Sequence, residues 1–472
     1  MNKRYQLSWD LWPKAGMLEG YPSTDYFCIH TLIAPAIIYV GDELYSMPDY
    51  GNYHTPSLQY SYDKANWFDI PANRLITITN CAYFKSPTEH TIWSGSFSCN
   101  KPFYVSGKLS TLINPNPDAQ TVHIPHNGFQ YLFSSPNIPE GFSLDYLLSA
   151  KYLLFNNLID DLGVISDSQS ESLSSANYRG AFRGMFRHCG ALVPPDTINP
   201  INVTFAMCEE MFRYSGIKYM PSLPTLDLGR KTITSYKMSG SVGIQVPFAT
   251  VDNITNWNIL STVYYTSANC YLNMFADCRS LTTISNLPAT SLSKWSYSSM
   301  FRNCVNLITA PAIAAITVVY ECFYEMFANC TKLENPATII ETLQTYTYNS
   351  NYLFRGYGTG ASNDNSQPIF RGMYLNCTNL KYMPKLPKLD MSSFSYSEVR
   401  HPDYPCLNML KSCTQIKLTA STTTETPYVF KIPYAYQSFL EDTDDIGVYV
   451  VDNNNSKPAL NTTYYCNLQT IQ

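Results

Sequence analysis

The chain has 472 residues, of which only 14% are charged, and its formal net charge is -5. This length is enough for two or three domains, and the weak negative charge excludes binding to nucleic acid or to an anionic membrane by bulk electrostatics. The N-terminal stretch has no apolar run and no later segment is long and apolar enough to span a bilayer, so we expect neither a secretory signal nor membrane insertion. Without an oxidising compartment, the 14 cysteines are expected to be thiols.

Residues 1-120 are predicted to form a β-rich N-terminal domain. The stretches "RLITITN" (Arg74 to Asn80) and "KPFYVSGKLSTL" (Lys101 to Leu112) alternate apolar and polar positions between Pro, Asn and Gly, which favours antiparallel strands. The chain also has 38 tyrosines against 6 tryptophans and 23 phenylalanines. Tyrosine suits strands, and it also suits binding surfaces because it offers a rigid amphipathic contact area. Composition leaves both interpretations open.

A short motif returns throughout residues 121-420, as in "CYLNMFADCRSL" (Cys270 to Leu281) and "CFYEMFANCTKL" (Cys322 to Leu333). Its methionines are separated by 26, 63, 26, 26, 47 and 36 residues, so the period is 26 residues and three intervals carry insertions. A fixed period of this size predicts stacked units. The aligned methionines are Met185, Met211, Met274, Met300, Met326, Met373 and Met409.

Within a unit, cysteine, methionine, cysteine and leucine follow one another at steps of 4, 4 and 3, which is typical of one face of a short helix. The Pro-containing, β-branched run after each motif predicts a short extended segment. The expected fold class is therefore α+β, a solenoid of short helix-strand units preceded by the β-rich domain, which the resemblance described below makes leucine-rich-repeat-like. The predicted core residues of the units are Cys189, Met274, Cys278, Leu281, Met300, Cys304, Met326, Cys330, Met373 and Cys377.

The repeated cysteines are a poor zinc pattern. Zinc sites favour two cysteines two to four residues apart, whereas the pairs here are eight residues apart with a methionine between them. Ser215 also replaces the second cysteine in one unit. We therefore expect no metal and no cofactor, and interpret the thiols as small buried hydrophobic groups.

The pattern MFxxCxxL, followed by LPAT or APAI and with CYxxMF opening the next unit, resembles the BspA-like leucine-rich-repeat proteins of gut Bacteroidota and their phages. The similarity covers roughly Phe129 to Ala420, and the segments Ser57 to Ser86 and Ser94 to Asn114 are similar to the β-rich lead segment before such repeats. The resemblance implies a right-handed solenoid with adhesive or recognition roles and no enzymatic activity. We expect the chain to depart from the cell-surface members in lacking a signal peptide and a lipoprotein cysteine near the start.

Three insertions interrupt the period, near residues 229-269, 341-367 and 397-405. Insertions into repeats form loops on one face, often the binding face, and the first two carry aromatic residues among small polar ones. Packing of these aromatic residues back onto the scaffold is the alternative. The candidate partner-binding residues are Tyr236, Trp257, Tyr264, Tyr265, Tyr346, Tyr348, Tyr352 and Tyr357.

The repeat pattern stops near residue 420, and residues 421-472 are expected to be a C-terminal cap or a docking segment. No phosphate loop, GxSxG or GxGxxG motif is present. The sequence "HIPH" (His123 to His126) lacks the four-residue helical spacing of a zincin, and the acidic cluster from Glu441 to Asp445 lacks the alternating spacing of a calcium loop. We predict no catalytic residue.

These features predict a non-enzymatic structural and recognition protein of a phage virion, tail- or fibre-associated, that is assembled in the host cytoplasm. Its expected partners are other virion proteins and a host surface glycan or protein, and an oligomer would raise avidity. A bacterial cell-surface adhesin of the same repeat family is one alternative. A virion-associated glycan-degrading enzyme is another, since the separation of a carboxylate pair is a property of the fold.

Overall fold

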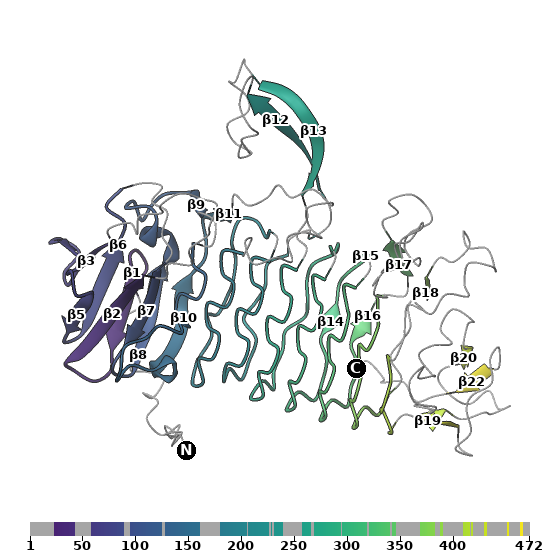
Figure 1. Cartoon of the computed structure of the whole chain (residues 1–472). Coiled ribbons are helices and arrows are strands. Elements are labelled where there is room, and N and C mark those ends of the chain that lie inside the picture. Colours follow the sequence, from purple (N-terminus) through teal and green to yellow (C-terminus); the bar gives the residue numbers. More distant parts are fainter. Residues whose placement is uncertain are drawn as a thin grey trace.

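The computed structural model shows a β domain at one end, a row of stacked repeat units beside it and a hairpin that stands out from the row (Figure 1). Each repeat unit winds once around the stack and is called a coil below. The helices among the described residues are the 3-10 turns η3 (Leu109–Leu112) and η4 (Leu144–Tyr146). The structure describes residues 23–42, 58–88, 95–124, 128–160, 180–204, 206–225, 228, 231–238, 257–265, 269–293, 295–318, 321–339, 342–345, 369–382, 388–389, 409–415, 417–418, 429–431, 451–452 and 463–465.

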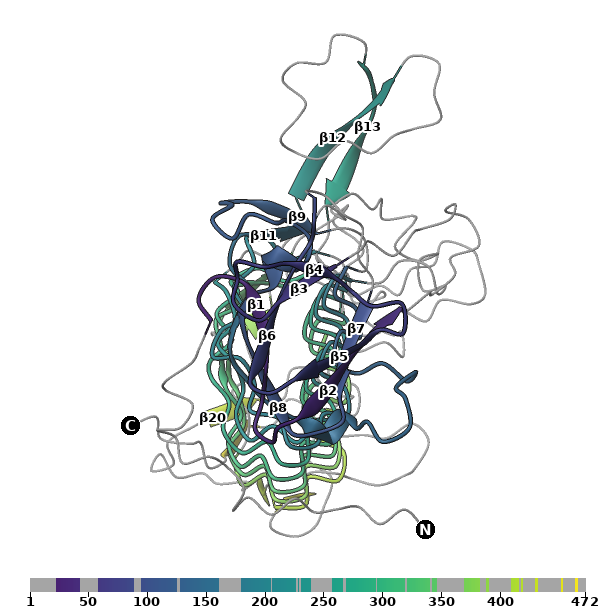
Figure 2. The same ribbon diagram turned by 90° about the vertical axis from the view of Figure 1, so that its left-hand side faces the viewer.

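The β domain consists of two sheets that lie face to face (Figure 2). All strand pairs in them are antiparallel except the β10–β8 pair. The smaller sheet has the order β5 (Leu75–Ile78), β2 (Ala36–Asp42), β7 (Gly95–Cys99). The larger sheet has the order β10 (Leu147–Leu154), β8 (Phe103–Lys108), β1 (Phe27–Thr31), β6 (Cys81–Lys85), β3 (Gln59–Ser61), β4 (Phe68–Asp69).

Alternating residues of the strands fill the space between these sheets. In β6, Ala82 and Phe84 are buried, while Cys81 is only half-buried on the opposite face. The ring of Phe27 from the larger sheet lies 5.1 Å from that of Phe97 in the smaller one. Phe27 also lies 6.2 Å from Phe133, whose N–H donates to the carbonyl of Met185 in the neighbouring coil (3.0 Å), so one hydrophobic core continues from the β domain into the stack.

Strand β10 joins the β domain to the coils. It pairs in parallel with β8 on one side, and the N–H of Ala150 donates to the carbonyl of Val193 on the other (2.9 Å). Strands β9 (Val122–Ile124) and β11 (Leu158–Asp160) form a separate parallel pair near the joint.

The repeat units are built from successive turns and contain no α-helix among the described residues. An α-helix requires each N–H to reach the carbonyl four residues earlier. Here the N–H of Met185 donates to Phe182, three residues earlier (3.1 Å), while the next N–H, from Phe186, donates to Met211 in the neighbouring coil (2.8 Å). Alternate amides therefore close turns within a coil and link one coil to the next.

The predicted solenoid of helix-strand units is wrong, because the described part of the chain is strand-rich and its repeats consist of turns. The four-residue apolar spacing that indicated a helix comes instead from turns that repeat every four residues. Asn269, Asn273 and Asp277 mark these turns with φ of 59°, 54° and 63°, in the left-handed region that an α-helix excludes.

Aromatic rings form a column along the stack. The rings of Phe275 and Phe327 lie on either side of Phe301, each 5.5 Å from it and inclined by 6°. Tyr374 continues the column at 5.5 Å from Phe327. The carbonyls beside these rings link the coils, as in the bond from the N–H of Phe301 to Met326 (2.9 Å).

The remaining strands are short except for the hairpin. The hairpin consists of β12 (Lys231–Met238) and β13 (Trp257–Tyr265). The parallel pairs are β14 (Ala312–Ile313) with β16 (Thr338–Ile339), β15 (Thr317–Val318) with β17 (Thr342–Thr345), β17 with β18 (Lys388–Leu389), and β19 (Lys417–Leu418) with β21 (Val451–Asp452). Strand β20 (Val429–Lys431) pairs antiparallel with β22 (Thr463–Tyr465).

Candidate functional site

The hairpin β12–β13 lies within the first predicted insertion and extends away from the coils in both views (Figures 1 and 2). Its strands have eight and nine residues and are antiparallel throughout, with a register shift between Ser235 and Tyr236. A shift of this kind marks a bulge, which bends a ribbon and increases its twist.

Four of the eight candidate partner-binding residues belong to this hairpin. Tyr236 is opposite Ile259, and Trp257 is opposite Met238. Tyr264 and Tyr265 are at the other end of β13, opposite Thr232 and Lys231. The other four, Tyr346, Tyr348, Tyr352 and Tyr357, lie outside the described residues, as does most of the predicted segment 421-472.

The ten predicted core residues of the repeats are all fully buried, with no exposed surface. The thiols among them donate hydrogen bonds to backbone carbonyls of the preceding coil. The Sγ–H of Cys304 donates to the carbonyl of Phe275 (3.2 Å), and that of Cys330 donates to Phe301 (3.1 Å), each in the preceding coil. Burial raises the pKa of Cys330 to about 12. We call this series the thiol ladder; its members are Cys189, Cys278, Cys304, Cys330, Cys377 and Cys413.

A polar strip runs along one edge of the stack, three residues after each methionine. The amide of Asn303 donates to Asp277 (2.7 Å) and accepts from Asn329 (2.9 Å), and Asn376 donates in turn to Asn329 (2.8 Å). One amide N–H of each asparagine is thus used within the strip, which makes it a structural feature of the stack.

The strip ends in an aromatic and cationic group nearer the β domain. The ring of Tyr214 stacks on His188 at 4.8 Å, and the residue as a whole is 41% exposed. The guanidinium of Arg213 lies 4.8 Å from the Tyr214 ring and pairs with Glu210 and with Asp277. Burial of His188, together with the nearby arginine charges, lowers its pKa. This group presents an exposed ring, and its charges are already paired.

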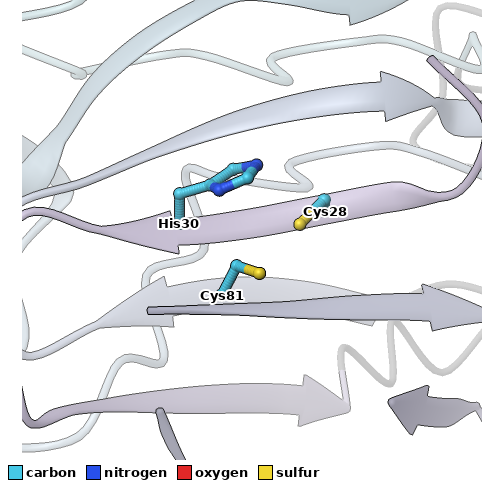
Figure 3. A group of neighbouring side chains, drawn as sticks. All are labelled: Cys28, His30 and Cys81. Atoms are coloured by element: carbon cyan, nitrogen blue, oxygen red, sulfur yellow. The ribbon is translucent and has the colours of Figure 1, made fainter. Parts of the chain in front are cut away.

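A second polar cluster lies in the β domain, on the face of the larger sheet away from the core. Cys28 and His30 alternate on β1 and so share a face, and His30 is directly opposite Cys81 on β6. Figure 3 shows the two sulfur atoms turned toward each other with the imidazole beside them. The ligating atoms of the three side chains all lie within 4.8 Å of one another.

The cluster is shielded and its imidazole is held in place. Cys28 is fully buried and His30 is 2% exposed, while Cys81 is half-buried. The His30 ring stacks on Tyr104 at 4.5 Å and 2°, and its Nε2 lies 3.0 Å from the Oγ of Ser106. Burial raises the pKa of Cys28 well above its ordinary value. The hydrogen bond with Cys28 lowers the pKa of Cys81, and His30 contributes in the same direction.

Sequence reasoning missed this cluster. The local signal is the Cys-x-His spacing of Cys28 and His30 in an alternating segment, which places both on one face of a strand. Cys81 belongs to the cluster only through the register of β1 with β6.

No family model matches the chain, and no curated protein or solved structure is significantly similar to it. The resemblance to BspA-like repeats therefore stays a prediction. Within the described residues, no helix combines the length and the hydropathy needed to cross a bilayer.

Proposed function

We propose that this chain is a non-enzymatic structural and recognition protein of a phage particle, tail- or fibre-associated, in which the coil stack holds a projecting hairpin toward a partner. The observation that carries the proposal is the hairpin β12–β13, which leaves the stack in both views (Figures 1 and 2). A ribbon of eight and nine residues is much longer than the turn needed to connect two adjacent coils.

The stack supplies a stiff support for such a device. In the described part of the stack, backbone amides bond successive coils to one another, and rings and thiols pack between the coils, as around Phe301 and Cys304. A binding element on a stiff support loses less conformational freedom when its partner binds. Several copies on one particle would add avidity to weak single contacts.

The proposed partners are other virion proteins on one side and a glycan or protein of the host surface on the other. The first test is location: peptide mass spectrometry of purified phage particles and of host envelope fractions from an infected culture. Sedimentation with the particles supports the proposal. Recovery only from the envelope refutes it and favours a cell-surface adhesin.

The second test addresses the hairpin. Residues 231–265 are replaced by a short Gly-Ser linker, and binding of the labelled chain to intact Bacteroidota cells is compared with that of the full chain. The matched control keeps the hairpin and carries Tyr214→Ala on the edge of the stack. Loss of cell binding in the linker variant alone supports recognition by the hairpin, whereas equal binding by all three proteins contradicts it.

A further inference from the structure

We propose that Cys28, His30 and Cys81 bind a zinc ion, with a water molecule as the fourth ligand. Two cysteines and one histidine are a ligand set that zinc accepts in tetrahedral sites that keep one open position. Among the described residues, one group of three potential metal ligands has its ligand atoms within 4.8 Å of one another, and it consists of these three side chains. The proposal is independent of the function proposed above.

The dimensions of the cluster fit this ion. Two sulfur atoms about 2.3 Å from a tetrahedral zinc lie about 3.8 Å apart. Because no separation in the cluster exceeds 4.8 Å, the sulfur atoms need to approach each other by at most about 1 Å, which is within the reach of side-chain rotations of Cys28 and Cys81. Two thiolates also balance the charge of the dication, so a buried site would carry no net charge.

The cluster differs from the thiol ladder, whose cysteines serve as core residues. Each ladder thiol has a backbone carbonyl as acceptor, such as Phe275 for Cys304 at 3.2 Å. The contact of Cys28 with a backbone carbonyl, that of its neighbour Ile29, is long at 3.9 Å. Cys28 instead faces a second thiol and an imidazole, which are the groups that a soft or borderline metal prefers.

The surroundings of His30 also match a metal ligand. A ligating histidine commonly donates its other ring N–H to an oxygen, which fixes the tautomer and the orientation of the ring. The Oγ of Ser106 lies 3.0 Å from His30 Nε2 and also accepts the N–H of Ser23 at 3.0 Å. With Nε2–H donated to Ser106, Nδ1 is the nitrogen that binds the metal. Tyr104 holds the ring from one side by stacking.

Access for the ion and for the water is available at Cys81. This cysteine is half-buried at the start of β6, whereas Cys28 and His30 are enclosed. We therefore place the water ligand on the side of Cys81, the member of the cluster with the most exposed surface.

The test measures zinc in the full chain, purified under reducing conditions and dialysed against a zinc buffer, by elemental mass spectrometry. We expect one zinc per chain, and loss of that equivalent in Cys81→Ser. We expect Ser106→Ala to weaken zinc binding about 10-fold, since it removes the oxygen that orients His30 and leaves the three ligands in place. Cys304→Ser is the matched control, because it removes a thiol of the ladder and not of the cluster. Ser215 occupies the equivalent position of another repeat unit, so a hydroxyl fits there. This variant should keep the zinc.

A second measurement does not depend on the variants. Cobalt(II) added to the reduced wild-type chain should give the intense near-ultraviolet absorption of thiolate-to-cobalt charge transfer, and zinc should displace it. Zinc should also raise the melting temperature of the wild type and leave that of Cys81→Ser unchanged. Absence of bound zinc, or equal zinc in Cys81→Ser and the wild type, would each overturn the proposal.

Discussion

Asn303 offers a direct test of the turn architecture, because its backbone and its side chain are both constrained. Its φ is 61°, its amide donates to Asp277 at 2.7 Å, and it accepts from Asn329 at 2.9 Å. Asn303→Gly removes the two side-chain hydrogen bonds and keeps the left-handed backbone accessible. With about 1 kcal/mol for each bond, we expect a loss of about 2 kcal/mol in the free energy of unfolding.

Asn303→Ala removes the same bonds but, unlike the glycine variant, keeps a Cβ in the left-handed region, where a Cβ costs about 1–2 kcal/mol relative to glycine. The alanine variant should therefore be the less stable of the two, as measured by urea unfolding followed by circular dichroism. Ile308 is the control in the same coil, since it is 50% exposed and is not among the residues with positive φ. There the glycine variant should be less stable than the alanine variant by about 0.4–1 kcal/mol, because glycine leaves the unfolded chain more conformational freedom. The turn interpretation would be refuted if the Asn303→Ala variant were as stable as the Asn303→Gly variant or more stable.

Three further predictions concern the stack. Burial raises the pKa of Cys330 from 9.0 to about 12, so between pH 9 and 12 the unfolded chain loses a proton that the folded chain keeps. The free energy of unfolding, measured with urea, should therefore fall as the pH rises from 9 to 12. The fall should be less steep in Cys330→Ser. In Gly216→Ala the new Cβ would lie 1.8 Å from the carbonyl oxygen of Gly190, so the coils must separate at a cost of about 1–3 kcal/mol; an unchanged melting temperature would contradict this. Phe301→Leu keeps an apolar side chain and loses two ring pairs, each worth about 0.5–1.5 kcal/mol, so chemical unfolding should show a loss of about 1–3 kcal/mol; wild-type stability would show that the ring column adds nothing beyond burial.

The sequence is a better guide to which repeat residues are buried than to the backbone conformation of the repeat. Spacing singled out Met300 and Cys304, and both are fully buried. The same spacing is compatible with a helix and with a series of four-residue turns, because both return the chain to one face every four residues. Asn269 and Asn273, four residues apart, are a signal for the turns, since asparagine tolerates positive φ better than most residues. Glu321 and Trp295 adopt the same backbone with no such signal.

The Cys28–His30–Cys81 cluster shows a different limit. Alternation along β1 could be foreseen from the sequence, but the position of Cys81 depends on which strand lies beside β1 and in which register. Likewise, the insertion near residues 229-269 could be located by counting, whereas its antiparallel ribbon depends on the pairing of Lys231–Met238 with Trp257–Tyr265.

The bonds between coils also determine how the molecule responds to force. Each coil is bonded to the coils before and after it, so a pull on the two ends of the stack loads these interfaces in series. Rings of successive coils are only 5.5 Å apart, yet a unit of 26 residues contains about 90 Å of extended chain. A stack under tension would therefore lengthen by peeling, one coil at a time, and each coil that peels would absorb mechanical work while the remaining coils stay folded.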